Sequence, residues 1–119
     1  ARTGADLDGA ASFHGSLGSQ TKAAPGTVKA KILVMTGGSD TYIPVEQIDE
    51  FRKEMDEAGA DYEVIIYPEA THSFTNPEAD ELGKKFDLPI TYNAEADKQS
   101  WAKMEEFLKE VFNQEQNGN

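Results

Sequence analysis

An aspartate and a histidine, each following an apolar segment, are the residues of this chain best suited to chemistry. Asp40 comes after the run Ile32–Met35, and His72 comes after the run Val64–Ile66. In many hydrolases a carboxylate fixes the tautomer of an imidazole, and the imidazole then removes the proton of a nucleophile. An acid followed along the chain by a histidine is the order of the last two members of one such triad. We therefore predict that Asp40 and His72 form the acid–base pair of an acyl-transfer site.

The nucleophile for this pair is not recognisable in the 119 residues. The chain has no cysteine and no Gly-x-Ser-x-Gly elbow. Three serines lie near the expected site, Ser16, Ser39 and Ser73, and none has glycines at both elbow positions. We therefore expect the nucleophile to lie upstream of Ala1, and the chain by itself to be inactive.

Three segments predict a parallel β-sheet. Uninterrupted apolar or small side chains are typical of strands that helices cover on both faces. The predicted strands are Leu7–His14, Ala30–Thr36 and Tyr62–Tyr67, with the most apolar one, Ala30–Thr36, in the middle. Strands that alternate with helices imply right-handed parallel crossovers and thus a three-layer α/β fold. Asp40 and His72 would then lie beyond the carboxyl ends of their strands, where ligands bind in such sheets.

Two helices are predicted from apolar side chains that recur at spacings of three and four. The first would end at Gly59, and its stripe consists of Val45, Ile48, Phe51 and Met55. The second would be capped by Asn93, and its stripe consists of Trp101, Met104, Leu108, Val111 and Phe112. Residues 75–92 are interpreted as a loop with one helical turn near 79–85. The chain is thus expected to form one domain over residues 1–113, followed by a polar tail at 114–119.

Three of these segments resemble the dienelactone hydrolase family of α/β-hydrolases. The similar stretches are Asp8–Gly15, Ile32–Asp40 and Tyr67–Phe74, and Tyr92–Asp97 is similar to one branch of the family. The resemblance covers nearly the whole chain. It implies the C-terminal half of an esterase-like enzyme with a Cys or Ser nucleophile.

The resemblance also implies residue roles and a substrate class. It assigns the triad acid to Asp40 and the triad base to His72, and no residue here receives the nucleophile or oxyanion role. Family members that cleave dienelactone place an arginine shortly after the histidine. This chain has Asn76 in that stretch. The implied substrate is therefore a neutral small-molecule ester.

Other polar residues at the strand ends have alternative roles. His14 is expected to make structural hydrogen bonds near the site, because the base is already placed. A metal site could be assembled by residue type from His14, Asp40, Glu69 and His72. None of these has the short helical spacing of a typical zinc site, so we expect neither a metal nor another cofactor.

Charge and composition exclude several kinds of partner. The net charge is −11, from 22 acidic and 11 basic residues, and such a surface repels nucleic acid and anionic membranes. Hydrophobic and charged contents of 38% and 28% are those of a soluble globular protein. No apolar run reaches the ~18 residues of a membrane helix. A cytoplasmic location is expected, with export left open because the true N-terminus is not seen.

Two other hypotheses stay open. The chain could be a non-catalytic α/β module that binds a ligand or partner at the strand ends, or part of a serine peptidase of the same fold. In the hydrolase interpretation, the outer edge of Leu7–His14 lacks the strand that flanks it in the family, and bare edges recruit other strands. We therefore expect a homo-oligomer formed through this edge, or pairing there with the missing N-terminal half.

Overall fold

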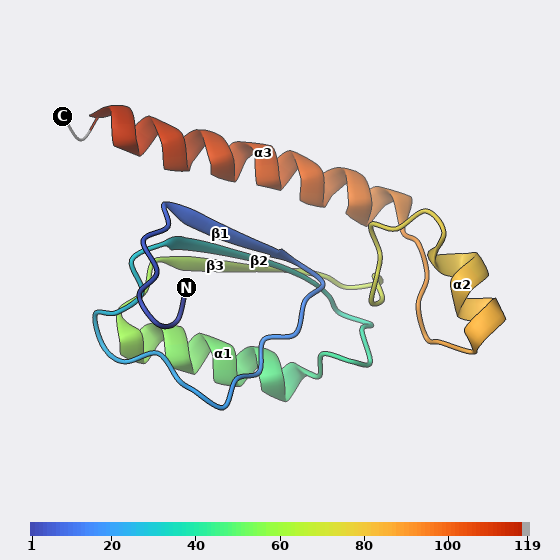
Figure 1. The fold of residues 1–119 in the computed structure, drawn as a ribbon. Helices are drawn as coiled ribbons and strands as arrows, with labels where there is room; N and C mark the ends of the chain where they lie inside the picture. The colour runs from blue at the N-terminus through green and yellow to red at the C-terminus, as the bar shows by residue number, and fades with distance from the viewer. Residues whose placement is uncertain (118–119) are drawn as a thin grey trace.

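The computed structural model describes the backbone of residues 1–117 and the side chains of residues 1–113. It contains β1 (Gly9–Phe13), β2 (Lys31–Gly37), α1 (Val45–Ala58), β3 (Tyr62–Tyr67), α2 (Ala79–Phe86) and α3 (Ala94–Asn117). The three strands form one parallel sheet in the order β1-β2-β3. Helix α1 covers one face of the sheet and α3 covers the other (Figure 1). The predicted three-layer α/β fold, with its second strand in the middle, is therefore confirmed.

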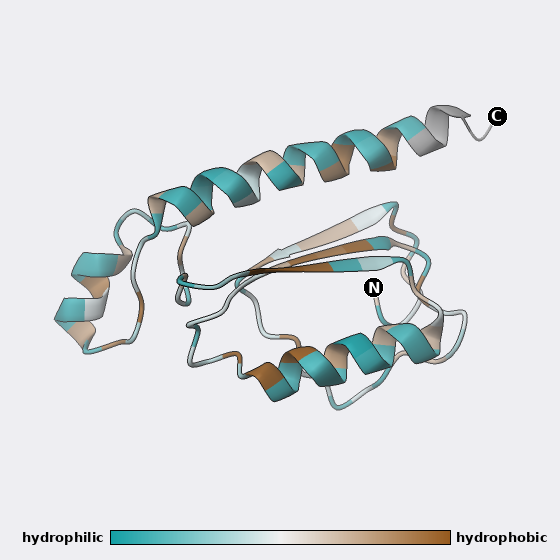
Figure 2. Cartoon of the chain, turned by 180° about the vertical axis from the view of Figure 1, so that it is seen from behind, coloured by the Kyte–Doolittle hydropathy of each residue, from teal (hydrophilic) through white to brown (hydrophobic). Residues whose placement is uncertain are grey.

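The middle strand is buried because a helix covers each of its faces. Its side chains alternate between two cores, as the period of a strand requires. Ile32 and Val34 pack toward α1, whereas Leu33 and Met35 pack with residues of α3. Leu33 and Met35 are fully buried, and each such side chain contributes roughly 1.5–3 kcal/mol of transfer free energy. Figure 2 shows the corresponding hydrophobic colour on the sheet between two helices that are largely hydrophilic.

Helix α1 follows its predicted stripe at three of four positions. Ile48, Phe51 and Met55 are buried, whereas Val45 is 63% exposed. Val45 is the first residue of the helix and lies at the rim of a cavity of about 270 Å³ beside the strand ends. The helix ends as predicted at Gly59, whose φ of 69° is left-handed and therefore favours glycine.

The predicted buried face of the last helix was partly wrong. Trp101, Leu108 and Phe112 are exposed. The side chains that face the sheet are Ala96, Ser100, Met104, Phe107 and Val111. Helix α3 carries two apolar stripes, and the sheet buries only one of them. On the other stripe, Trp101 stays half exposed while its ring lies 5.0 Å from that of Phe13 in β1. The covered stripe packs closely on β1, where a Cβ at Gly9 would lie 3.1 Å from both Phe107 and Val111.

The connection between the last strand and the last helix is more regular than predicted. Helix α2 spans eight residues where a loop with one turn was expected. The predicted cap of α3 is present, because the Asn93 side chain accepts a hydrogen bond from the Ala96 backbone N–H at 3.0 Å. Helix α3 runs on to Asn117, into the segment predicted as a polar tail, and residues 118–119 of that tail lie outside the described residues. No described helix combines the length and apolar character needed to cross a membrane.

Candidate active site

A tight turn after β2 positions Asp40. Within this turn, the Gly38 N–H donates to the Tyr67 carbonyl at 2.8 Å, and the Ser39 N–H donates to the Ala70 carbonyl at 3.0 Å. Tyr67 ends β3 and Ala70 belongs to the loop that leads to His72. Backbone hydrogen bonds thus join the turn that carries Asp40 to the loop that carries His72, independently of the side chains.

Two glycines at the end of β2 allow this approach. A Cβ at Gly37 would overlap the carbonyl group of Ala70, and a Cβ at Gly38 would lie 2.8 Å from the Pro68 Cα and carbonyl oxygen. These glycines had no predicted role. A glycine pair at the end of a buried strand is nonetheless a signal of close backbone approach.

The side chains of Asp40 and His72 are hydrogen-bonded to each other. His72 Nδ1 lies 2.9 Å from Asp40 Oδ2, so the contact expected between them is present. An ionised carboxylate only accepts hydrogen bonds, and Nδ1 is therefore the donor. The other carboxylate oxygen, Oδ1, accepts the Tyr42 backbone N–H at 2.8 Å. In the tautomer that donates from Nδ1, the lone pair of the imidazole lies on Nε2.

Burial differs sharply between the two partners. The Asp40 side chain is fully buried, whereas the His72 side chain is 30% exposed. A buried carboxylate with donors on both oxygens is held in a single orientation. An imidazole that is exposed on one side can still meet a substrate or a second catalytic group. The geometry therefore suits a fixed acid and an accessible base.

Two aromatic rings contact the imidazole of His72 edge-on. The ring centroids of Tyr42 and His72 are 5.0 Å apart at 62°, and those of His14 and His72 are 5.4 Å apart at 68°. Tyr42 is half exposed and was not predicted as a site residue. Its position two residues after Asp40 was the only signal for it in the sequence.

His14 makes the hydrogen bond expected of it. Its Nε2 lies 2.9 Å from Thr75 Oγ1, in the loop that carries His72. Burial lowers the pKa of His14, and the neighbouring His72 lowers it further, while Asp40 and a backbone hydrogen bond partly offset both effects. The neutral form of His14 is therefore favoured.

The loop of the base is anchored on its far side as well. His72 forms an isolated parallel bridge with Ile90, and the Thr71 hydroxyl oxygen accepts the Thr91 N–H at 2.8 Å. Ser73 has a left-handed φ of 65°, which an L-residue rarely adopts. The segment after α2, which was predicted as loop, thus supports the loop that carries His72.

Two of the three serines considered as nucleophiles bond to other groups. Ser39 Oγ donates to the Pro68 carbonyl at 2.9 Å, and Ser16 Oγ lies 3.4 Å from Gln47 Oε1. Within the described part of the chain, no serine hydroxyl is hydrogen-bonded to His72. The same residues contain no group of three or more His, Cys, Asp or Glu side chains arranged to hold a metal ion.

A parallel α/β sheet with an acid and a histidine at its carboxyl edge is the arrangement of the α/β-hydrolases. The family model described as "Dienelactone hydrolase family" matches residues 1–112. The chain belongs to this family, as its sequence resemblance implied.

Solved structures share the fold of this chain. One is a dienelactone hydrolase-like promiscuous phosphotriesterase from metagenomic libraries, with a TM-score of 0.83 and 31% identity. Another, m3DLH, has a TM-score of 0.80 and 28% identity. Each match covers 92% of this chain and 45% of the other.

Curated relatives are also longer than this chain. A "Putative carboxymethylenebutenolidase" of Yersinia pestis is 37% identical over 75 residues, which are 63% of this chain and 24% of that protein. An uncharacterized protein of Caenorhabditis elegans is 36% identical over 81 residues, which are 68% of this chain and 49% of that protein. The matched part of the chain thus spans between a quarter and a half of these relatives.

Proposed function

We propose that this chain supplies the acid and the base of the catalytic triad of a carboxylic ester hydrolase. Asp40 is the acid and His72 the base. The observation that carries the proposal is the 2.9 Å contact between His72 Nδ1 and Asp40 Oδ2, with the carboxylate buried and the imidazole partly exposed. Membership of the dienelactone hydrolase family supports the same assignment of chemistry.

The proposed reaction uses the two nitrogens of His72 differently. Nδ1–H donates to Asp40, and Nε2 takes the proton of a nucleophile as that nucleophile attacks the ester carbonyl. The buried carboxylate stabilises the imidazolium that forms. The imidazolium then protonates the leaving alkoxide, and a water activated by the same Nε2 hydrolyses the acyl intermediate.

The proposed nucleophile, a serine or a cysteine, lies outside these 119 residues. Two observations support this. The sequence contains no cysteine and no nucleophile elbow, and the described serines make no hydrogen bond to His72. The relatives and solved neighbours have at least twice as many residues as this chain matches. The chain by itself therefore lacks ester hydrolase activity.

The proposed substrate is a small neutral ester. The residues that follow the base, 73–83, contain no Lys or Arg to hold a substrate carboxylate. Asn76 in this stretch uses its side-chain oxygen to accept the Glu78 N–H at 3.0 Å. One structural neighbour is described as a promiscuous phosphotriesterase, so a neutral phosphotriester belongs in the substrate panel beside carboxylic esters.

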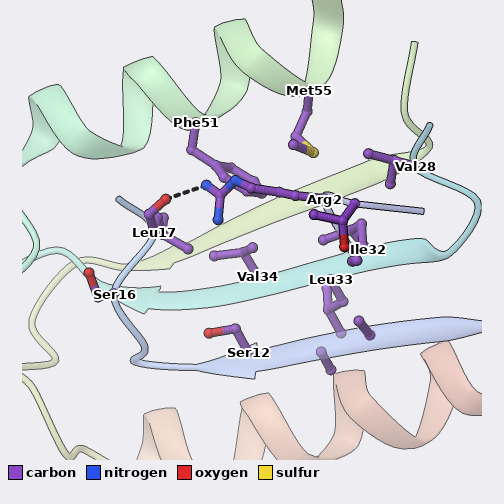
Figure 3. A pocket seen from close by; sticks show the side chains of 14 residues that line it. Arg2, Ser12, Ser16, Leu17, Val28, Ile32, Leu33, Val34, Phe51 and Met55 are labelled. Atoms are coloured by element: carbon purple, nitrogen blue, oxygen red, sulfur yellow. Dashed lines mark hydrogen bonds between the residues drawn. The ribbon is translucent and has the colours of Figure 1, made fainter. Parts of the chain in front are cut away.

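We also propose that the rest of a family domain binds at the outer edge of β1. β1 has a neighbour on one side only among the described strands. A cavity of about 330 Å³ opens beside it, between the sheet and α1, with the apolar side chains of Val34, Phe51 and Met55 in its wall (Figure 3). The solved neighbours, of which this chain matches 45%, contain enough further chain to cover it. A second copy of this chain is the competing occupant.

The test of the proposed function compares longer proteins that carry this segment and a nucleophile. Asp40→Asn and His72→Ala are each expected to lower p-nitrophenyl acetate hydrolysis by about 10³–10⁴-fold, because each removes a member of the triad. A matched control is Asp61→Asn, a carboxylate at the opposite end of the sheet. Activity within tenfold of the parent in both triad variants would refute the assignment.

The same experiment separates the alternative functions. A fluorophosphonate that labels the longer protein identifies a serine nucleophile, and a thiol reagent identifies a cysteine. Cleavage of peptide amides in preference to esters would favour the serine peptidase hypothesis. The absence of both labelling and turnover would favour a non-catalytic module.

A further inference from the structure

His14 contacts the loop of the base at three of its residues. Its Nε2 lies 2.9 Å from Thr75 Oγ1, and its ring lies edge-on to Phe74 at 5.2 Å and to His72 at 5.4 Å. His14 itself directly follows β1, and its N–H continues the sheet by donating to the Met35 carbonyl at 2.8 Å. One side chain therefore connects the sheet to the loop that carries His72.

The backbone at this contact is in an uncommon conformation. Among the described residues, only His14, Ser73 and Asp87 are non-glycine residues with positive φ. Two of the three, with φ of 44° and 65°, therefore lie at the contact between His14 and the base loop. Left-handed backbone in non-glycine residues costs free energy and persists where the surroundings impose it. Two such residues at one contact indicate that tertiary packing imposes this backbone conformation, rather than local backbone preference alone.

We propose that His14 is a positioning residue for His72. Its hydrogen bond to Thr75 and its edge-on ring hold the turn at residues 72–75, and so keep Nδ1 of His72 on the carboxylate of Asp40. This inference rests on the proposed role of His72 as the base. It assigns His14 no contact with substrate.

The chain permits an unusually clear test, because His14 and His72 are its only histidines. Long-range proton–nitrogen correlation spectra of the 15N-labelled chain at pH 8 report the ratio of Nδ1–H to Nε2–H tautomers for each ring. His72 in the parent is expected to be mostly the Nδ1–H tautomer. The His14→Asn variant assigns the spectrum, since it retains one histidine, and Asn tolerates the left-handed backbone at this position.

Thr75→Val removes only the hydroxyl that bonds to His14. His14→Asn removes both this hydrogen bond and the ring that lies edge-on to His72. Each is expected to lower the Nδ1–H fraction of His72 relative to Nε2–H by about fivefold, the factor that one lost hydrogen bond gives. Thr27→Val is the matched control. Its hydroxyl donates to the Ala24 carbonyl at 2.6 Å before the start of β2, at the opposite end of the sheet. The amide spectrum shows in each case that the fold is kept.

The proposal is overturned if either site variant leaves the ratio within twofold of the parent, or if the control shifts it as much. A variant that loses its amide spectrum is replaced by Thr75→Ala, which removes the same hydroxyl from a smaller side chain. Because no turnover is measured, the result is independent of the proposed enzyme activity. Triad variants that kept full activity would refute the proposed function and leave the tautomer measurement unchanged.

Discussion

Gly37 lies directly against the carbonyl group of Ala70, and this contact brings the turn with Asp40 against the loop with His72. A Cβ at position 37 would overlap that carbonyl. The hydrogen bond from the Ser39 N–H to the same carbonyl, at 3.0 Å, depends on the close approach. The 2.9 Å contact between Asp40 and His72 therefore rests on a glycine that carries no chemistry of its own.

Gly37→Ala is expected to destabilise the fold by about 2 kcal/mol, because the methyl group forces the acid turn away from the base loop. Urea unfolding measures this as a lower midpoint. Gly18→Ala is the control, since a Cβ there would make only ordinary contact with Gln47 at 3.6 Å. Equal midpoints for the two variants would contradict the packing argument.

The isolated chain is expected to hydrolyse p-nitrophenyl acetate no faster than buffer. Under the proposed function, the nucleophile and the oxyanion donors, each typically worth about 3 kcal/mol, lie outside these residues. The assay compares the chain with its His72→Ala form. A rate that disappears only in the variant would reveal an overlooked nucleophile, with Ser16 the first residue to replace.

Arg2→Ala is expected to destabilise the chain by about 2 kcal/mol at pH 7, because it leaves a buried carboxylate with fewer donors. Arg2 Nε donates to Glu54 Oε2 at 2.8 Å, and a second guanidinium nitrogen donates to Oε1 at 3.0 Å. The side chain of Glu54 is 4% exposed. The control Lys53→Ala breaks an exposed pair with Glu57 and should cost less than about 0.5 kcal/mol.

The effect of Arg2 should also depend on pH. Its hydrogen bond lowers the pKa of Glu54, with the Ala23 N–H acting in the same direction and burial opposing it. A depressed carboxyl pKa stabilises the fold above the pKa of the unfolded chain, and this stabilisation is lost as pH falls through the folded pKa. The difference between parent and Arg2→Ala should therefore shrink below about pH 4.5. A difference that stays constant down to pH 3 would be inconsistent with this linkage.

Titration of His14 should make the fold less stable in mild acid. Burial, followed by repulsion from His72, lowers the pKa of His14, and attraction to Asp40 only partly offsets this. The unfolded chain therefore binds a proton at a higher pH than the folded chain does. Stability is complete above the unfolded pKa of ~6.5 and falls as pH drops below it toward the folded pKa.

Urea midpoints between pH 8 and pH 5 measure this loss. His14→Asn should flatten the dependence, and His72→Gln should raise the pKa of His14 by removing a positive neighbour. The comparison is confined to pH 5 and above, because carboxyl groups in general titrate at lower pH. An unchanged slope in His14→Asn would show that another group is responsible.

Sedimentation of the chain is expected to show association that increases with concentration, because the outer edge of β1 and the cavity beside it attract another strand. The net charge of −11 opposes self-association but is screened over ~8 Å at physiological salt. Ser12→Lys on β1 should weaken association, whereas Phe86→Ser, an exposed aromatic on α2 away from β1, should not. A single 13.0 kDa species at every concentration would contradict the expectation.

Sequence patterns were sufficient to predict the elements whose environment is uniform along their length. β2 is apolar at consecutive positions because a helix covers each of its faces. This pattern indicates burial of the strand even when the elements that cover it are not known. The stripe of α1 and its end at Gly59 are likewise local, since helical periodicity and a left-handed cap depend only on neighbouring residues. The chain order of Asp40 and His72 placed both at one edge of the sheet.

Which surfaces of these elements pack together could be seen only in the folded chain. Trp101 and Phe107 are both large aromatic residues, and which of their stripes is buried depends on how closely α3 approaches β1 at Gly9. The hydrogen bonds of Asp40 and His14 with the base loop join residues 32 and 61 positions apart. Such contacts arise from the packing of turns whose approach is set by the whole sheet, so no local pattern encodes their distances.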